Sequence, residues 1–178
     1  KEKAAQLTRN NFNGLAAYEE KDETPFRFGS FTTMGELYVE TGLNELRMSN
    51  YRRILSLDSA MVVVQFDKDG VQYQRKYFIS YPDSVMVMKF TANQSGKQNL
   101  ILSYCPNSEA KSNLRADGKD GLVYTGVLDN NGMKFAFRIK AIHKGGTLEA
   151  ENDRLIVKGA DEVVFLLTAD TDYKMNFN

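Results

Sequence analysis

The sequence has little of the residue types that build metal sites and disulfide frameworks. Its 178 residues include one cysteine, Cys105, and one histidine, His143. One cysteine excludes an internal disulfide, and a Cys/His zinc site would need carboxylates to complete it. The sequence therefore predicts no structural zinc, and we expect neither a metal nor a cofactor.

Excess charge and long apolar runs are also missing. Lysine and arginine number 23, as do aspartate and glutamate, so the formal net charge is zero and no net field attracts nucleic acid or an anionic membrane. No apolar run approaches the roughly 18 residues of a membrane span. The opening KEKAAQLTRNN has no apolar signal-peptide core. We expect neither nucleic acid nor a membrane as a partner.

The chain does not begin with methionine, and we interpret its opening as the interior of a longer polypeptide. The first thirteen residues are rich in helix formers and are followed by Gly14, which predicts a short helix. A chain of this length favours one domain with a full core. We predict a helical lead-in over residues 1–14 and a single β-domain, part of a larger protein, over residues 15–178.

Period-two alternation is the strongest signal in the rest of the chain. In MKFAFRIKA, Phe135, Phe137 and Ile139 alternate with basic residues, the pattern of a strand with one buried and one wet face. Similar strand-like runs begin at Glu36, Met61, Val71, Ser84, Asn99, Leu122, Arg154 and Glu162. Short turn sequences such as DKDG and KGG separate them and favour antiparallel pairing. Without βαβ alternation, two stacked sheets bury these faces, so we predict an all-β fold: a large antiparallel β-sandwich of the supersandwich type with a short N-terminal helix.

One hairpin can be predicted in more detail. Met61–Phe66 and Val71–Ile79 flank DKDG, a turn sequence that favours a hairpin. Tyr73, Arg75 and Tyr77 then share one strand face. A salt bridge or an aromatic stack within the scaffold is the simplest role for the arginine.

Candidate chemical groups each have a structural interpretation beside the functional one. His143 is the natural base for a catalytic triad, but no G-x-S-x-G pattern accompanies it, which favours a solvated turn residue. Cys105 in SYCPN is predicted to be a buried, inert thiol. The acidic clusters DKDG, RADGKDG and TADTDY lack the spacing of a calcium loop, which favours turns. Asp170 and Asp172 should lie on the same strand face.

Three segments, taken in order, resemble a known family. They are TTMGELYVE (32–40), YRRILSLDSAMVVVQFDKDGVQYQRKYFISYPDSVMVMKFTA (51–92) and GMKFAFRIKAIHKGGTLEAENDRLIVKGADEVVFLLTADTDY (132–173). Together they are similar to the N-terminal β-domain of family 95 glycoside hydrolases, which include α-L-fucosidases and related α-L-galactosidases. The most specific part is Y-R-R-x-L-x-L-D-x-A, a strand, a D-G turn and then Y-x-R-x-Y-F-x-S-x-P-D.

The resemblance implies a β-sandwich that is joined by a linker to an (α/α)6 barrel, which carries the acid and base carboxylates. The family's glycine-rich G-N-G-x-L-G segment, its N-E-D-x-L-W segment and the barrel are all absent from this sequence. No catalytic residue is therefore assigned here. We expect a non-catalytic accessory domain whose partner is the barrel of the same polypeptide. The resemblance implies export to the periplasm or beyond, while the sequence leaves the localisation, the sugar and its linkage open.

The alternative function is an independent carbohydrate-binding module for fucosylated or galactosylated glycans. The chain has no tryptophan but has nine tyrosines and eleven phenylalanines, which weakens this alternative without removing it because sugars stack on aromatic rings. Thr33, Met34 and Gly35 are the candidate pocket wall or domain interface, with a tight structural turn as the other interpretation. Loss of the opening strands would expose sheet edges, so we also expect the isolated chain to form a homodimer through them.

Overall fold

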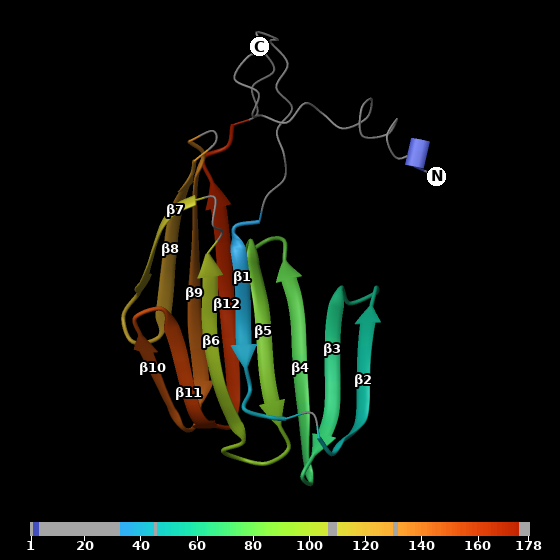
Figure 1. Cartoon of the computed structure of the whole chain (residues 1–178). Helices are drawn as coiled ribbons and strands as arrows, with labels where there is room; N and C mark the ends of the chain where they lie inside the picture. The colour runs from blue at the N-terminus through green and yellow to red at the C-terminus, as the bar shows by residue number, and fades with distance from the viewer. Residues whose placement is uncertain (1, 4–32, 45, 107–109, 130–131, 175–178) are drawn as a thin grey trace. The chain divides into compact units, whose positions relative to one another are not determined.

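The computed structural model describes residues 2–3, 33–44, 46–106, 110–129 and 132–174. The chain divides into two compact units, Lys1–Met34 and Gly35–Asn178, and the twelve strands found in the described residues all lie in the second unit (Figure 1). Glu2 and Lys3 are helical. The rest of the predicted lead-in helix and its boundary at residue 14 lie outside the described residues. Within the described part of the chain, no helix has the length and apolarity to cross a membrane.

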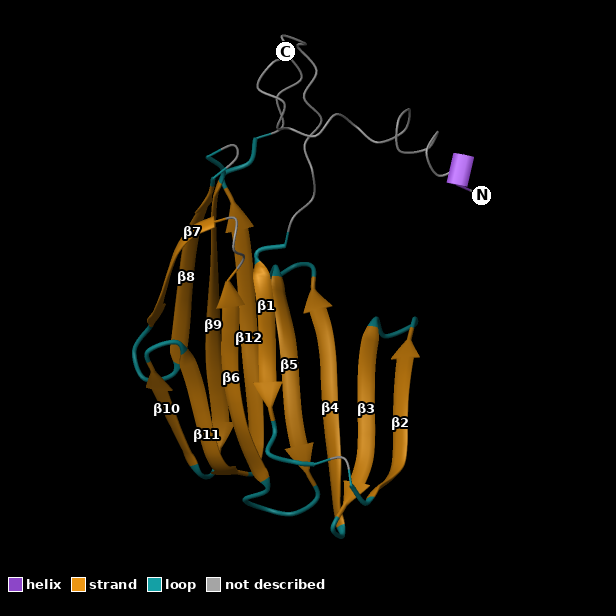
Figure 2. Cartoon of the chain, in the orientation of Figure 1, coloured by secondary structure: helices purple, strands orange, loops and turns teal. Residues whose placement is uncertain are grey.

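The strands form two antiparallel sheets, shown in Figure 2. The small sheet has the order β1 (Gly35–Glu40), β6 (Gln98–Pro106), β11 (Arg154–Ala160), β10 (Thr147–Glu151). The large sheet has the order β2 (Met48–Ser56), β3 (Met61–Lys68), β4 (Val71–Ser80), β5 (Val85–Ala92), β12 (Glu162–Thr171), β9 (Lys134–Lys144), β8 (Gly121–Leu128), β7 (Ala110–Ala116). The predicted all-β antiparallel sandwich is confirmed.

The strand with the clearest alternation forms as expected. In β9, Phe135, Phe137 and Ile139 are buried while Lys134 and Arg138 are exposed. The small sheet covers the apolar side of this strand. The alternation in the sequence therefore identifies the inner face of the large sheet directly.

The predicted hairpin between β3 and β4 is closed by a two-residue turn. Lys68 pairs with Val71, and the residues between them, Asp69 and Gly70, have φ angles of 50° and 76°. Two successive positive φ angles are those of a type I′ turn, whose twist matches that of the flanking strands. The DKDG signal is thus confirmed as a turn.

Arg75 lies on the inner face of the large sheet, among aromatic rings. Its guanidinium carbon is 5.1 Å from the ring centroid of Phe66 and 6.0 Å from that of Phe90. A guanidinium at such distances is attracted to the ring faces. Of the two expected roles for Arg75, the structure shows the aromatic stack.

The core lies between the small sheet and the middle of the large sheet. Tyr104 of the small sheet packs on Tyr124 and Phe137 of the large sheet, with ring centroids 4.6 Å and 4.5 Å apart. Tilted and edge-on contacts at these distances are favourable for aromatic pairs. Burial raises the pKa of the Tyr104 hydroxyl, and the nearby Tyr124 adds to the effect.

The small sheet covers only part of the large one. Contacts between the sheets join β6 to β5, β10 and β11 to β9, and β11 to β8. The connection from β1 to β2 covers one end of the remaining strands, where Leu43 and Met48 pack on the buried Phe66 and Tyr73. Strands β4, β3 and β2 lie to the right of β1 in Figure 1, where no described strand of the small sheet follows β1.

Candidate functional site

The predicted pocket wall begins at the first strand of the small sheet. Gly35 has a φ of 147°, and a Cβ at this position would overlap with the Tyr104 ring and the Cys105 carbonyl oxygen. The glycine therefore makes room for a core tyrosine. Thr33 is exposed and Met34 is half-buried. A role of these three residues in a pocket wall or a domain interface stays a prediction.

The two residues considered as catalytic groups lie on strands. His143 is exposed near the end of β9, and its Nδ1 lies 2.8 Å from the carbonyl oxygen of Gly145. Cys105 is exposed, so the prediction of a buried thiol was wrong. The physical reason is the alternation of β6, in which Tyr104 points inward and its neighbour must point outward.

Two aspartates in the turn between β7 and β8 form surface ion pairs with basic residues of β9. Asp117 lies 3.0 Å from Arg138, and Asp120 lies 3.2 Å from Lys140. Such pairs contribute little stability individually. Within the described ranges, no group of three or more histidine, cysteine, aspartate or glutamate residues could hold a metal ion.

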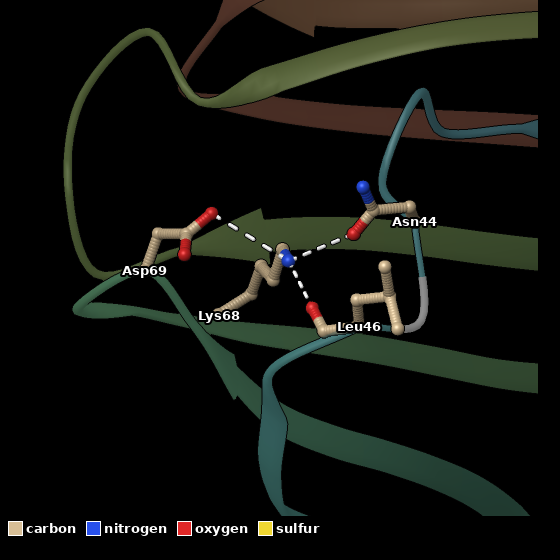
Figure 3. A network of polar contacts seen from close by, with 4 residues as sticks. All are labelled: Asn44, Leu46, Lys68 and Asp69. Atoms are coloured by element: carbon tan, nitrogen blue, oxygen red, sulfur yellow. Dashed lines mark hydrogen bonds and ion pairs between the residues drawn. The ribbon is translucent and has the colours of Figure 1, made fainter.

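A buried lysine organises the connection between the two sheets (Figure 3). The Lys68 side chain is 8% exposed. Its Nζ donates to Asn44 Oδ1 at 2.9 Å and to the Leu46 carbonyl oxygen, and it lies 3.7 Å from an Asp69 carboxylate oxygen. A buried ammonium group needs such partners to offset the loss of hydration. The network therefore fixes the β1–β2 connection rather than presenting a group to a ligand.

An open groove of about 660 Å³ lies across one end of the large sheet, a volume typical of ligand sites. It is lined by Lys111, Ser112, Asn113, Thr125, Gly126, Val127, Lys134, Phe135, Ala136, Asp170, Thr171 and Asp172. The exposed lining residues of β8 and β9 alternate with buried ones. The groove therefore lies on the outer face of the large sheet, opposite the small sheet.

The groove has an apolar floor and a polar rim of mixed charge. Val127 and Ala136 contribute exposed apolar surface. Asp170 and Asp172 are both exposed on the same side, as predicted, and Asp172 Oδ1 accepts a hydrogen bond of 2.8 Å from the Lys134 backbone N–H. Carboxylate, ammonium and hydroxyl groups around an apolar floor can bind the hydroxyls and C–H faces of a sugar.

A second feature is an apolar surface on the inner face of β2 and β4. Phe90 of β5 pairs with Arg75 of β4, which pairs with Val64 of β3, and Val64 pairs with Arg53 of β2. The inner face of the large sheet therefore continues across these strands. Ile79 of β4 and Leu55 of β2 lie on this face, because each is an even number of residues from Arg75 or Arg53. Leu55 is 64% exposed and Ile79 is 71% exposed. We call the surface formed by Tyr51, Leu55, Tyr77 and Ile79 the uncovered face.

Exposed apolar side chains continue around the uncovered face. Tyr51 is 60% exposed, and Leu57 and Tyr81 are exposed in the two turns at the same end of the sheet. Exposed large apolar side chains are therefore gathered at this end of β2 and β4. The sequence did not reveal it, because an apolar residue in a strand carries no signal that none of the described strands faces it.

Comparisons with known proteins find one matching family model and two similar curated proteins. The family model described as "Glycosyl hydrolase family 65, N-terminal domain" matches residues 1–176. "Probable alpha-fucosidase A" of Aspergillus niger is 28% identical over 163 residues, which cover 85% of this chain and 19% of that protein. "Alpha-L-fucosidase 2" of Arabidopsis thaliana is 23% identical over 167 residues, covering 80% of this chain and 20% of that protein.

A solved structure shares the fold. A chain described as a kojibiose phosphorylase from the human microbiome superposes with a TM-score of 0.53 and 10% identity, covering 77% of this chain and 22% of that one. The present chain thus spans about one fifth of the length of the curated relatives that it matches. The resemblance to a glycoside hydrolase N-terminal domain is confirmed, while the matching model belongs to family 65 instead of family 95.

Proposed function

This chain belongs to the family of glycosyl hydrolase family 65 N-terminal domains, and from that premise we propose that it is a non-catalytic accessory domain of an α-L-fucosidase-like glycoside hydrolase. The observation that carries the proposal is the family match over residues 1–176. The catalytic carboxylates would lie in another domain of the same polypeptide, an (α/α)6 barrel by the resemblance of the sequence motifs to family 95 enzymes. In this arrangement the sandwich supports the barrel.

The fucosidase part of the proposal is supported by two observations. Both curated relatives carry fucosidase names, and the motifs around Tyr51–Ala92 resemble the fucosidase-containing family 95. The chain matches 19% and 20% of the length of these two relatives. In our proposal the catalytic residues lie in the part of the polypeptide that this chain does not match. We propose that the parent protein hydrolyses α-L-fucosides or α-L-galactosides.

The test compares the 178-residue chain with the longer polypeptide that contains it. Both are assayed with aryl α-L-fucoside and aryl α-L-galactoside at equal molar concentration. We expect turnover by the longer polypeptide and none by the chain alone. Turnover by the chain alone would remove the accessory role, and an inactive longer polypeptide would remove the fucosidase assignment.

A second candidate function is glycan binding by the groove on the outer face of the large sheet. The supporting observation is its combination of volume, apolar floor and polar rim. Calorimetric titration of the chain with fucosylated and galactosylated oligosaccharides tests it. We expect Asp170→Asn to weaken binding at least several-fold, while Asp153→Asn, an exposed acid outside the groove, leaves binding unchanged. Absence of binding across the panel would remove this candidate.

A further inference from the structure

A small cavity lies where three parts of the fold meet. Arg75 and Phe90 line it from the large sheet, Gln98 and Leu100 line it from β6 of the small sheet, and Leu43 lines it from the β1–β2 connection. Its volume is about 10 Å³, which is about the space that one water molecule needs. A species held in this cavity would therefore contact both sheets at once.

The side chain of Gln98 brings an unpaired hydrogen-bond donor to the cavity. Gln98 begins β6, points inward in the alternation of that strand and is 3% exposed. Its Nε2 is buried and has no hydrogen-bond partner in the part of the chain that the structure describes. A buried donor without a partner is costly. The cavity is thus a place where the fold can accept a hydrogen-bond acceptor.

Arg75 brings a positive charge to the same cavity. Its guanidinium lies beside the rings of Phe66 and Phe90. It also interacts with the Tyr77 hydroxyl: burial raises the pKa of Tyr77, and the charge of Arg75 opposes this rise. Among the described residues, no aspartate or glutamate forms an ion pair with Arg75. A guanidinium is always charged and offers several N–H donors, so this charge lacks a carboxylate partner.

The rest of the lining adds no negative charge. Lys97 supplies a second ammonium group, and Thr41, Tyr73 and Asn99 are neutral polar residues. The apolar walls formed by Leu43, Phe90 and Leu100 exclude water, so charges in the cavity are screened less than at the surface. The lining therefore favours an anion.

One carboxylate acts on this region from outside the cavity. Burial raises the pKa of Tyr73, and the charge of Asp69 adds to that rise. Asp69 also lies 3.7 Å from Nζ of Lys68, whose positive charge offsets it. The positive charges of Arg75 and Lys97 therefore dominate the cavity.

We propose that this cavity binds a single monatomic anion of the chloride class, held between the guanidinium of Arg75 and the side-chain amide of Gln98. The anion joins β4 of the large sheet to β6 of the small sheet, and so it stabilises the folded chain by mass action. Its site is separate from the groove on the outer face and is independent of the catalytic activity of the parent protein.

The size and the donors of the cavity select this ligand. Sulfate, phosphate and free carboxylic acids are too large for a space of about one water molecule. A water molecule must also donate its own hydrogens, whereas an anion only accepts them, and donors predominate at Arg75, Lys97 and Gln98. Lys97 and Asn99 are exposed, which gives the ion a path from solvent.

Urea unfolding of the 178-residue chain in two salts provides the first test. Sodium gluconate is replaced by sodium chloride at constant ionic strength, because gluconate is too large for the cavity. We expect the urea midpoint to rise by about 0.5 M or more when chloride reaches about ten times its dissociation constant, and bromide should act in the same way. A midpoint that does not rise would show that the cavity holds water only and would overturn the proposal.

Matched substitutions of two arginines provide the second test. Arg75 and Arg53 both point to the inner face of the large sheet, but Arg53 is exposed and does not line the cavity. We expect Arg75→Gln to remove most of the chloride-dependent shift and Arg53→Gln to retain it. A shift that survives Arg75→Gln would mean that chloride acts elsewhere, and the proposed site would be wrong.

Gln98→Glu tests the site without removing its positive charge. The new carboxylate has nearly the shape of the amide and would take the place of the anion beside Arg75. We expect a folded variant whose urea midpoint no longer responds to chloride. A variant that responds to chloride as the wild type does would overturn the proposal, and so would bromide-containing crystals of the wild type that show bromide outside this cavity and none within it.

Discussion

The two halves of the large sheet have similar apolar inner faces and very different burial. Where the small sheet covers β5, β12, β9 and β8, side chains such as Phe90 and Phe165 are almost completely buried. On β2 and β4, Leu55 and Ile79 point to the same side and are mostly exposed. Burial in this fold is therefore decided by the facing layer and not by the strand's own sequence. The uncovered half carries apolar side chains such as Leu55 and Ile79 beside the arginines Arg53 and Arg75, and no described strand faces them.

The two halves should differ most in how much stability is lost when an apolar side chain is replaced by alanine. Phe165→Ala should lower the free energy of unfolding by about 3–5 kcal/mol, because it removes a buried ring and leaves a cavity. Leu55→Ala in the same 178-residue chain should change it by about 0.5 kcal/mol, as expected of an exposed site. Urea unfolding of both variants measures the values. Equal losses would mean that the halves are equally well packed.

Gly35, at the start of the edge strand β1, gives the second prediction. Gly35→Ala should cost about 1–3 kcal/mol from overpacking against Tyr104, added to the cost of a positive φ. Gly42 has a φ of 63° and open space around it, so Gly42→Ala should cost only the backbone term of about 1–2 kcal/mol. Thermal unfolding compares them. Should the two variants lose equal stability, the close packing of Gly35 would be refuted.

The connection that covers one end of the uncovered half gives the third prediction. Lys68→Met removes the donor to Asn44 and Leu46, and we expect a loss of about 1–3 kcal/mol because polar groups lose their partner. Lys158→Met, on the exposed outer face of the small sheet, is the control and should be close to neutral. A neutral Lys68→Met variant would show that the network does not hold the connection in place.

The covered half also predicts a dependence on alkaline pH. Burial raises the pKa of Tyr104 above its ordinary value of about 10, so the folded state retains the proton where the unfolded state loses it. The associated stability is fully present below about pH 10 and is lost as the pH rises toward the folded-state pKa. Unfolding free energies measured across this range should fall less steeply for Tyr104→Phe than for the wild type. The same slope in both proteins would contradict this role of Tyr104.

Strands that are central in a sheet could be predicted from the sequence, whereas three edge strands could not. MKFAFRIKA and EVVFLLT predict β9 and β12 because each has at least one apolar face that the core requires. The strands β2, β7 and β10 are at sheet edges and are largely exposed, so selection for burial leaves no strong period in them. Edge strands are also where the fold can pair with other chains.

The candidate site was less predictable than the fold. The groove combines residues from β7, β8, β9 and β12, which are distant in sequence and lie together only because of the strand order. The pairing of Asp170 and Asp172 on one face followed from their spacing. The exposure of Cys105 followed from the inward position of Tyr104, which the apolar run NLILSYC did not specify.

Amide hydrogen exchange of the 178-residue chain, measured strand by strand, tests the central comparison most directly. Strands β3, β4, β9 and β12 each pair on both sides within the large sheet, so they differ mainly in the layer that faces them. The amides of β9 and β12 should exchange at least an order of magnitude more slowly than those of β3 and β4. Equal protection of the two pairs of strands would contradict the conclusion that the facing layer decides burial and stability in this fold.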